Sequence, residues 1–543
     1  MKLEAGIPVK LAKRIDWQLL LFLLVFLQVK LAVKVAAIVV ICLLHWNFRF
    51  GLRLKHSRLP LFYPLVILIS LVGLLFNGGL SPHYGVVFLT AVGGWLMAFL
   101  AIHQIRLFVD RNDEEVTRQT MVVYFLINAA VSLGTLVLIM IRTGSLNPYL
   151  YQGQHQLFFV STGDYIKGVP FDTSVTNAIL NAFGVIYFLS RKNAGMVLLC
   201  MSVVVLTASN LTSLILLAVF ACLLVFGSGR EQKSLIFICF FMLVVFMAKI
   251  SPQNDSYAAE ILAKITPSKP AETQISGVGP ANNRANPVPP LPTHPGNPDT
   301  RRLKESELRN FEVPRQSPIF LFIQAGKRPF IPGPNINNAP YQAVNDTTET
   351  RKKLLEFIDN HRDHLPLASS ASEIAGLPPG KLVGARQTLE YLKTHPQLAL
   401  FGDGAGKFSS KLALRATGLH TDGGYPASLA YISPEYLINH LDLYLYYFSR
   451  QKALHSVINT PDSVYDQLLG EYGLAGLTVL VVCYFGFFIR RIHGMTALAL
   501  VGLLGGVFFA GYWFEQFSIV PLFELLFFLI LKEQRKYNII HAE

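Results

Sequence analysis

Residues 17–46 read WQLLLFLLVFLQVKLAVKVAAIVVICLLHW, an apolar run that Gln28, Lys30 and Lys34 interrupt near its middle. One membrane-spanning helix needs about 20 mostly apolar residues, so the run is too long for one helix and predicts two short helices in a hairpin. Comparable apolar stretches recur near residues 60–77, 84–105, 119–141, 173–190, 194–209, 211–228, 234–250, 467–489, 494–513 and 516–531. The pattern predicts an all-α polytopic membrane protein with about 12 transmembrane helices.

The composition supports a membrane protein. Of the 543 residues, 52% are hydrophobic and only 15% are charged, and the mean hydropathy is +0.42. A soluble globular protein carries about 25% charged residues. A small soluble domain, a disordered regulator and a secreted disulfide scaffold are therefore excluded.

The positive charges predict the orientation in the membrane. Lys and Arg gather in alternate loops, at residues 49–58, 106–118, 191–192, 230–233 and 490–491. Such loops stay cytoplasmic, so both termini are expected in the cytoplasm. The net charge of +13 is then mostly an orientation signal, and no nucleic-acid partner is expected.

The chain divides into three parts. Residues 1–250 carry nine predicted membrane helices, residues 251–465 form one large extracytoplasmic insert of mostly helical or irregular structure, and residues 466–543 carry three helices and a cytoplasmic tail. Within the insert, residues 266–345 are dense in Pro, Asn and Gly, and such a composition buries too little apolar surface to fold alone. We interpret this segment as a tether or a surface wrap, and residues 350–465 as a helical active-site region.

The helical region contains two predicted helices, Lys352–His361 and Lys381–Lys393. In the second, Arg386 shares a face with Leu382 and Leu389, so we expect it to point toward packed protein. It forms either an i,i+4 pair with Glu390 or a guanidinium clamp on phosphate. The aromatic tract 431–448 is either a packed helix or a platform for sugar rings or lipid tails.

Two glycine-containing stretches follow. Gly402-Asp-Gly-Ala-Gly-Lys407 lacks the Ser or Thr and the glycine spacing of a P-loop, although such a turn can still present backbone N–H groups to an anion. Downstream, Glu471 lies close to the membrane interface, where an acidic group is either part of a capped helix start or a functional residue. The short turn 207–213 caps two predicted membrane helices.

Taken in order, these stretches resemble the O-antigen ligase and polysaccharide polymerase family of bacterial envelopes. An Arg-containing helix followed by a glycine-rich turn matches Arg386 and the stretch from Pro396 to Phe408. The family segment that opens the next membrane helix matches residues 462–476 at its Tyr, Gln, Glu and Gly positions, which include Tyr465 and Glu471. The turn 207–213 is similar to the family's Ser-Arg turn.

The chain departs from the family at two positions. Asp462 stands where the ligases have their His, with His455 as the nearest histidine, and Asn210 stands where they have an Arg in the short turn. The candidates to replace these groups are Lys407, His420, Arg415 and His440, and spacing does not choose among them.

The resemblance implies a membrane glycosyltransferase that uses an undecaprenyl-diphosphate-linked glycan donor, in the bacterial inner membrane with the insert in the periplasm. Cations must hold the leaving diphosphate and a base must take the acceptor proton. We expect Arg386 and Lys407 to form the clamp, and Asp462, His455 or Glu471 to be the base or its partner. The predicted substrate-binding residues are Lys407, Asn210, His440 and Tyr465.

The outward segments contain no Asp-x-Asp pair, so we expect neither a metal nor another cofactor. Membrane lipids and other polysaccharide-export proteins are further candidate partners. Polymerase and ligase are not separated by the sequence, although the missing ligase-type His favours a polymerase. The rival interpretations are a flippase for lipid-linked glycans and a non-catalytic envelope scaffold or sensor.

Overall fold

The computed structural model describes residues 15–27, 31–53, 57–76, 81–150, 162–227, 229–250, 380–416, 425–431, 433–440, 443, 457–492 and 494–540. These residues are mostly helical and include no β-strand. Before the insert the helices are α2 (Trp17–Phe26), α3 (Leu31–Leu44), α4 (Phe62–Phe76), α5 (Pro82–Arg111), α6 (Glu114–Thr143), α7 (Ser174–Ser190), α8 (Ala194–Leu206), α9 (Asn210–Phe226) and α10 (Arg230–Val245).

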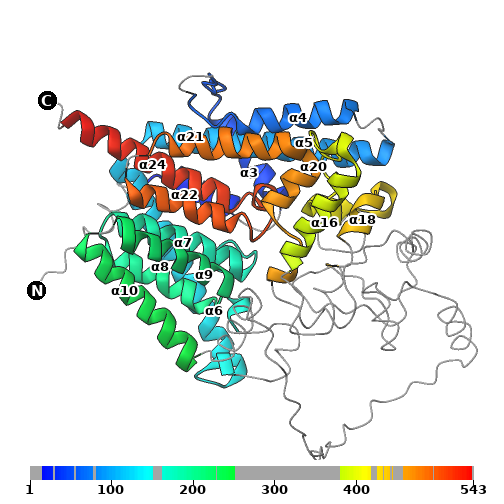
Figure 1. Cartoon of the computed structure of the whole chain (residues 1–543). Coiled ribbons are helices and arrows are strands. Elements are labelled where there is room, and N and C mark those ends of the chain that lie inside the picture. Colours follow the sequence, from blue (N-terminus) through cyan, green and yellow to red (C-terminus); the bar gives the residue numbers. More distant parts are fainter. Residues whose placement is uncertain are drawn as a thin grey trace, which may run out of the picture.

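The remaining helices come from the insert and the C-terminal part (Figure 1). The insert contributes α16 (Gly380–Thr394), α17 (Lys411–Ala416) and α18 (Pro434–Asn439). The C-terminal part contributes α20 (Val464–Val479), α21 (Gly486–Ile489), α22 (Met495–Val507), α23 (Trp513–Gln516) and α24 (Ile519–Ile540). Every predicted apolar segment is a helix, as is the predicted segment Lys381–Lys393.

The helices are those of a membrane-embedded protein. Four of the described helical stretches are long and apolar enough to cross a bilayer, namely Pro82–Arg111, Glu114–Thr143, Arg230–Ile250 and Val457–Ile489. Large apolar side chains also cover the outside of the bundle, such as Leu75, Leu89, Ile141 and Phe241. A soluble monomer rarely exposes so much apolar surface.

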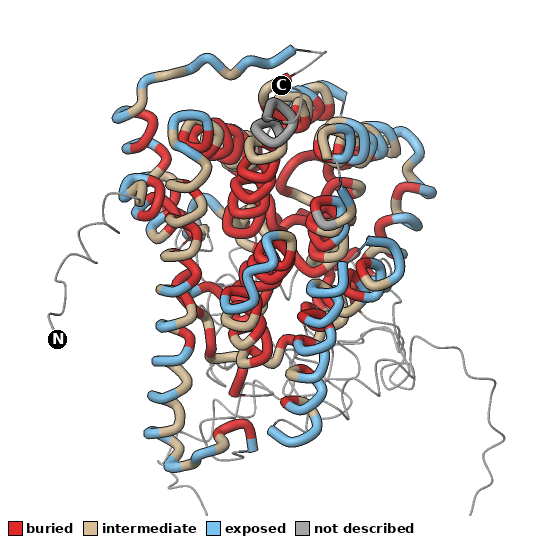
Figure 2. Tube along the Cα trace, turned by 90° about the vertical axis from the view of Figure 1, so that its left-hand side faces the viewer, coloured by how far each residue is buried: buried red, intermediate tan, exposed pale blue. Residues whose placement is uncertain are grey.

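The core of the bundle surrounds α24. This helix contacts α5, α6, α7 and α22, and its residues from Ile519 to Leu531 are buried. Figure 2 shows the buried residues concentrated in the centre of the bundle and the exposed ones on its outer helices.

The basic loops lie together at one end of the molecule. Arg111 pairs with Asp16 at 3.1 Å, and Lys532 Nζ donates to the carbonyl of Val109 at 2.8 Å. Arg491 also donates to the carbonyl of Ser57, at 2.6 Å. In Figure 1, α16 and α18 lie at the opposite end. Loops that the charge pattern assigns to one side of the membrane are therefore neighbours in space.

The N-terminal hairpin consists of two short helices. α2 has 10 residues and α3 has 14, which gives lengths of about 15 and 21 Å against a hydrocarbon core of about 30 Å. The start of α2 and the end of α3 share one end of the bundle, where His45 Nε2 lies 3.2 Å from Gln18 Oε1. Lys34, in the first turn of α3, is buried in the bundle.

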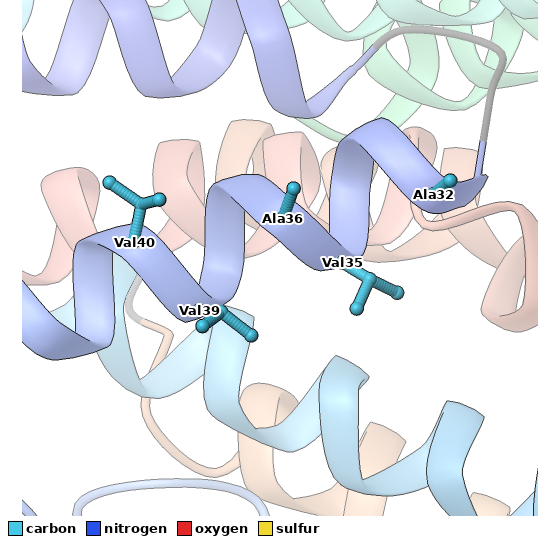
Figure 3. A pocket seen from close by; sticks show the side chains of 5 residues that line it. All are labelled: Ala32, Val35, Ala36, Val39 and Val40. Carbon is cyan, nitrogen blue, oxygen red and sulfur yellow. The ribbon is translucent and has the colours of Figure 1, made fainter.

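A shallow apolar groove runs along the outer face of α3. Figure 3 shows its lining side chains, which are Ala32, Val35, Ala36, Val39 and Val40. At 100° per residue these positions lie on the face of α3 opposite Lys34. The groove is thus separate from the polar interior that Lys34 enters.

Some predicted features lie outside the described residues. They are the Pro-rich segment 266–345, the predicted helix Lys352–His361 and most of the aromatic tract 431–448.

Candidate functional site

Glu471 and the glycine-rich stretch form a single unit. Its buried carboxylate accepts four backbone N–H groups: that of Gly406 at 2.7 Å on Oε2, and those of Phe408, Ser409 and Ser410 at 3.2, 3.2 and 3.0 Å on Oε1. The turn was predicted to present N–H groups to an anion, and the anion that they bind is a side chain of the protein itself. Glu471 therefore holds the loop in place, and its oxygens are not available to a substrate proton.

Glycines let the loop contact α20 backbone to backbone. Gly402 has φ +74°, and a Cβ there would lie 2.3 Å from the carbonyl carbon of Glu471. Gly473 has φ +63° inside α20 and would place a Cβ 2.5 Å from the carbonyl carbon of Leu400. Only glycine tolerates both this conformation and this contact. The two motifs are separated by about 60 residues in sequence, and their backbones pack directly against each other in the fold.

Lys407 is neutralised within the same loop. Its Nζ lies 3.2 Å from Asp403 Oδ1 and 5.7 Å from the ring centroid of Tyr84. Burial raises the pKa of Asp403 to about 6, while Lys407 opposes this rise. The negative charge of Asp403 raises the pKa of Lys407 above its usual value, against the effect of burial, which lowers it. The predicted clamp residue thus already has a partner.

The expectation that Arg386 points toward packed protein is wrong. Its face of α16, with Leu382 and Leu389, is the exposed one, and the Arg386 side chain is 80% exposed. It forms the i,i+4 pair with Glu390, with 2.9 Å between Nε and Oε1. The helix packs through its other face because Gly384 allows close contact with Pro461.

The packed face of α16 carries a buried lysine instead. Lys381 donates to Thr460 Oγ1 at 3.3 Å and to the backbone carbonyl of Asp462. Burial lowers the pKa of Lys381 to about 8, although Asp462 and Asp466 oppose the shift. This contact fixes the chain immediately before α20.

His440 is a packing residue. It is fully buried, with Nε2 3.4 Å from Asp466 Oδ2 and its ring against Phe408. Burial lowers its pKa to about 3, so the imidazole is neutral at physiological pH. A substrate-binding role, as predicted, would need solvent access that the side chain lacks.

The other predicted residues are placed as follows. The hydroxyl of Tyr465 donates to the carbonyl of Gly505 at 2.6 Å, which ties α20 to α22. Asn210 begins α9 and keeps a buried Oδ1 without a hydrogen-bond partner. Asp462 is partly buried just before α20. His455 and His420 lie outside the described residues.

Beside this unit lie three cations, Lys34, Lys411 and Arg415, which we call the cation cluster. Lys34 is buried, and its ammonium donates to the carbonyl of Gln516 and, at 2.9 Å, to Ser518 Oγ. Its charge interacts with those of Lys411 and Arg415 on α17. Burial and the neighbouring Arg415 lower the pKa of Lys411.

The carboxylates around the cation cluster are bound to other donors. Glu515 accepts Leu412 N at 3.1 Å and Gln467 Nε2 at 2.8 Å, and Asp172 accepts the hydroxyl of Thr176 at 3.1 Å. Within the described ranges, none of the three cations forms an ion pair with a carboxylate.

A buried amide network holds the segment that brings Asp172 here. Asn128 donates to Asn177 Oδ1 at 2.8 Å and accepts Val169 N at 2.8 Å. Gly168, with φ +64°, leaves no room for a Cβ against these amides. The segment before α7 is therefore packed into the bundle between α6 and α7.

Sequence reasoning did not assign Lys34, Lys411 or Glu515 to the site. A signal existed for Lys34, because it is one of the few basic residues, with Lys30, Arg142 and Lys167, in the loop set opposite the basic one. Lys411 and Glu515 carry no comparable signal, since their neighbourhood arises only when α17 and α23 pack together.

Comparison with known proteins does not assign a family. No protein-family model, curated protein or solved structure matches the chain. In the part of the chain that the structure describes, no group of three His, Cys, Asp or Glu side chains could hold a metal ion.

Proposed function

We propose that the chain is a membrane glycosyltransferase of the O-antigen ligase and polysaccharide polymerase type, which transfers or polymerises glycan from an undecaprenyl-diphosphate-linked donor. The observation that carries the proposal is the unit formed around Glu471. The two stretches that carry the family resemblance, residues 402–408 and 462–476, fold against each other through four hydrogen bonds to one carboxylate. If the two stretches matched the family only by chance, there would be no reason for them to contact each other in the fold.

The reaction is a displacement at the anomeric carbon. The acceptor oxygen forms a bond to that carbon, the bond from the carbon to the diphosphate oxygen breaks, and the diphosphate leaves on its lipid. The acceptor proton passes to a base. Among the described candidates we assign this role to Asp462, because it is partly buried directly before α20, where Lys381 donates to its backbone carbonyl, and its charge acts on Lys411 of the cation cluster.

We also propose a topology. Twelve helical segments cross the inner membrane, namely α2 to α10, α20 with α21, α22 and α24. This count keeps both termini in the cytoplasm and the insert in the periplasm, in agreement with the charge pattern.

The experiment is a glycan profile of a deletion strain that carries wild type, Asp462→Asn or the control Glu390→Gln. Gels and mass spectra of surface and lipid-linked glycans are compared after immunoblots show equal protein in the membrane. We expect wild type and the control to restore long chains and Asp462→Asn not to.

The identity of the accumulating species separates the two activities. Single lipid-linked repeat units that accumulate without the protein indicate a polymerase, and long undelivered chains indicate a ligase. An unchanged glycan profile in the deletion strain would overturn the proposal.

A further inference from the structure

The cation cluster has the properties of an incomplete ion-binding site. Its three positive charges come from the first turn of α3 and from α17, and Lys411 and Arg415 are like charges at i,i+4 on one short helix. Like charges so placed repel each other. Burying such charges without a counter-ion is costly, so the arrangement calls for an anion.

Donor groups in the cation cluster remain available. The Nε of Arg415 is buried and has no hydrogen-bond partner. Lys34 uses its ammonium on two neutral oxygens, those of Gln516 and Ser518, and an ammonium has three donors. Lys411 and Arg415 are each only partly buried, whereas Lys34 is buried.

The acidic groups around the cluster do not complete it. Asp172, Asp462 and Glu515 all act on Lys411, and they limit the net positive charge. Both oxygens of Glu515 already accept hydrogen bonds. The cations therefore lie within reach of these carboxylates without forming ion pairs with them.

We propose that Lys34, Lys411 and Arg415 bind a phosphate or diphosphate group, with Lys34 reaching it from α3. A guanidinium offers paired donors that match phosphate oxygens, and the two ammonium groups add point charges. This inference rests on the proposed function only for the source of the group, which is the headgroup of the lipid-linked donor. The three residues replace the pair Arg386 and Lys407 as the clamp.

Lys34 also places the site beside the start of α24. Its ammonium contacts Gln516 and Ser518, at the junction of α23 and α24. A lipid phosphate held there keeps its chain beside the apolar side chains of the bundle, whereas free phosphate has no such anchor.

The test measures binding of three probes to the purified full-length protein in nanodiscs: inorganic pyrophosphate, farnesyl diphosphate and farnesol. The variants are Arg415→Gln, Lys34→Gln and the control Arg386→Gln, whose exposed guanidinium pairs with Glu390. We expect farnesyl diphosphate to bind more tightly than pyrophosphate and farnesol to bind least. We expect Arg415→Gln and Lys34→Gln to weaken diphosphate binding at least about tenfold, and Arg386→Gln by less than about twofold.

Equal affinity for pyrophosphate and farnesyl diphosphate would keep the anion site and reject a lipid source. Unchanged diphosphate binding in both Gln variants would overturn the site. If a Gln variant does not fold, Arg415→Lys and Lys34→Arg replace it, because they keep the charge and alter the donor geometry. We then expect a lower affinity for diphosphate with an unchanged dependence of that affinity on salt concentration.

The outcome is separable from that of the proposed function. Diphosphate binding that depends on the cation cluster, in a protein whose deletion leaves all glycans unchanged, would support the site and reject the transferase. Loss of glycan in the deletion strain, with diphosphate binding insensitive to the cluster, would do the reverse.

Discussion

Replacing Glu471 by Gln tests the unit that joins the two motifs. An amide keeps one carbonyl oxygen, which can face the N–H groups of Phe408, Ser409 and Ser410 as Oε1 does. Its NH₂ group then faces the N–H of Gly406, which loses its acceptor. The hydrogen bonds from Phe408, Ser409 and Ser410 also become weaker, because their acceptor is no longer charged.

The expected cost follows from these losses. A hydrogen bond to a charged group contributes about 1 kcal/mol more than a neutral one, and a buried unpaired N–H costs about 1–3 kcal/mol. Against this, Gln avoids the burial of a charge. We expect a net loss of about 3 kcal/mol in the free energy that keeps the loop closed.

Trypsin cleavage after Lys407 and Lys411 measures loop opening. If cleavage follows the population of the open loop, 3 kcal/mol accelerates it about a hundredfold. The matched control is Glu390→Gln, an exposed pair in which we expect a change of only a few tenths of a kcal/mol. Cleavage of Glu471→Gln within about threefold of this control would show that the carboxylate does not hold the loop.

Three further substitutions test the site and its supports. Gly473→Ala, with its positive φ and its contact with the preceding loop, should destabilise the purified protein by about 3 kcal/mol or more, whereas Gly502→Ala, with open space around it, should change stability by less than about 1 kcal/mol in the same thermal melts. Asp403→Asn tests the raised pKa of Asp403. The stability that this carboxyl contributes is complete below pH 3.8 and is lost as the pH rises through about 6, so in thermal melts wild type should lose up to about 3 kcal/mol relative to the variant between pH 4 and 7. A stability difference that does not change with pH would refute the shift. Tyr465→Phe removes the bond to Gly505 and should cost about 1 kcal/mol in thermal melts without changing the glycan profile, while a lost profile at normal stability would restore its predicted substrate role.

The positions of the helices could be predicted from the sequence because apolar periods and charged loops act locally. The hairpin at residues 17–46 was recognised from its polar interruption, and the helix over 381–393 from its spacing. The contact of Lys34 with Ser518 was not predictable, since the two residues lie at opposite ends of the chain.

The site was predictable only in part. The glycines and Glu471 were identified, but their spacing could not reveal that the carboxylate fills the loop. The face of α16 was misjudged because Leu382 and Leu389 indicate burial in a soluble helix, whereas Gly384 and Lys381 make the packed contacts here. The cation cluster depends on tertiary packing, so no local sequence pattern predicts it.

The most direct test of the proposed function is a transfer assay in proteoliposomes. Lipid-linked glycan extracted from the deletion strain is incubated with the purified wild-type protein or with Asp462→Asn, and the lipid and glycan products are resolved by mass spectrometry. The proposal predicts longer glycan, or glycan moved to a new acceptor, together with free undecaprenyl diphosphate, for wild type only. Unaltered lipid-linked glycan with a folded wild-type protein that still binds farnesyl diphosphate would contradict it.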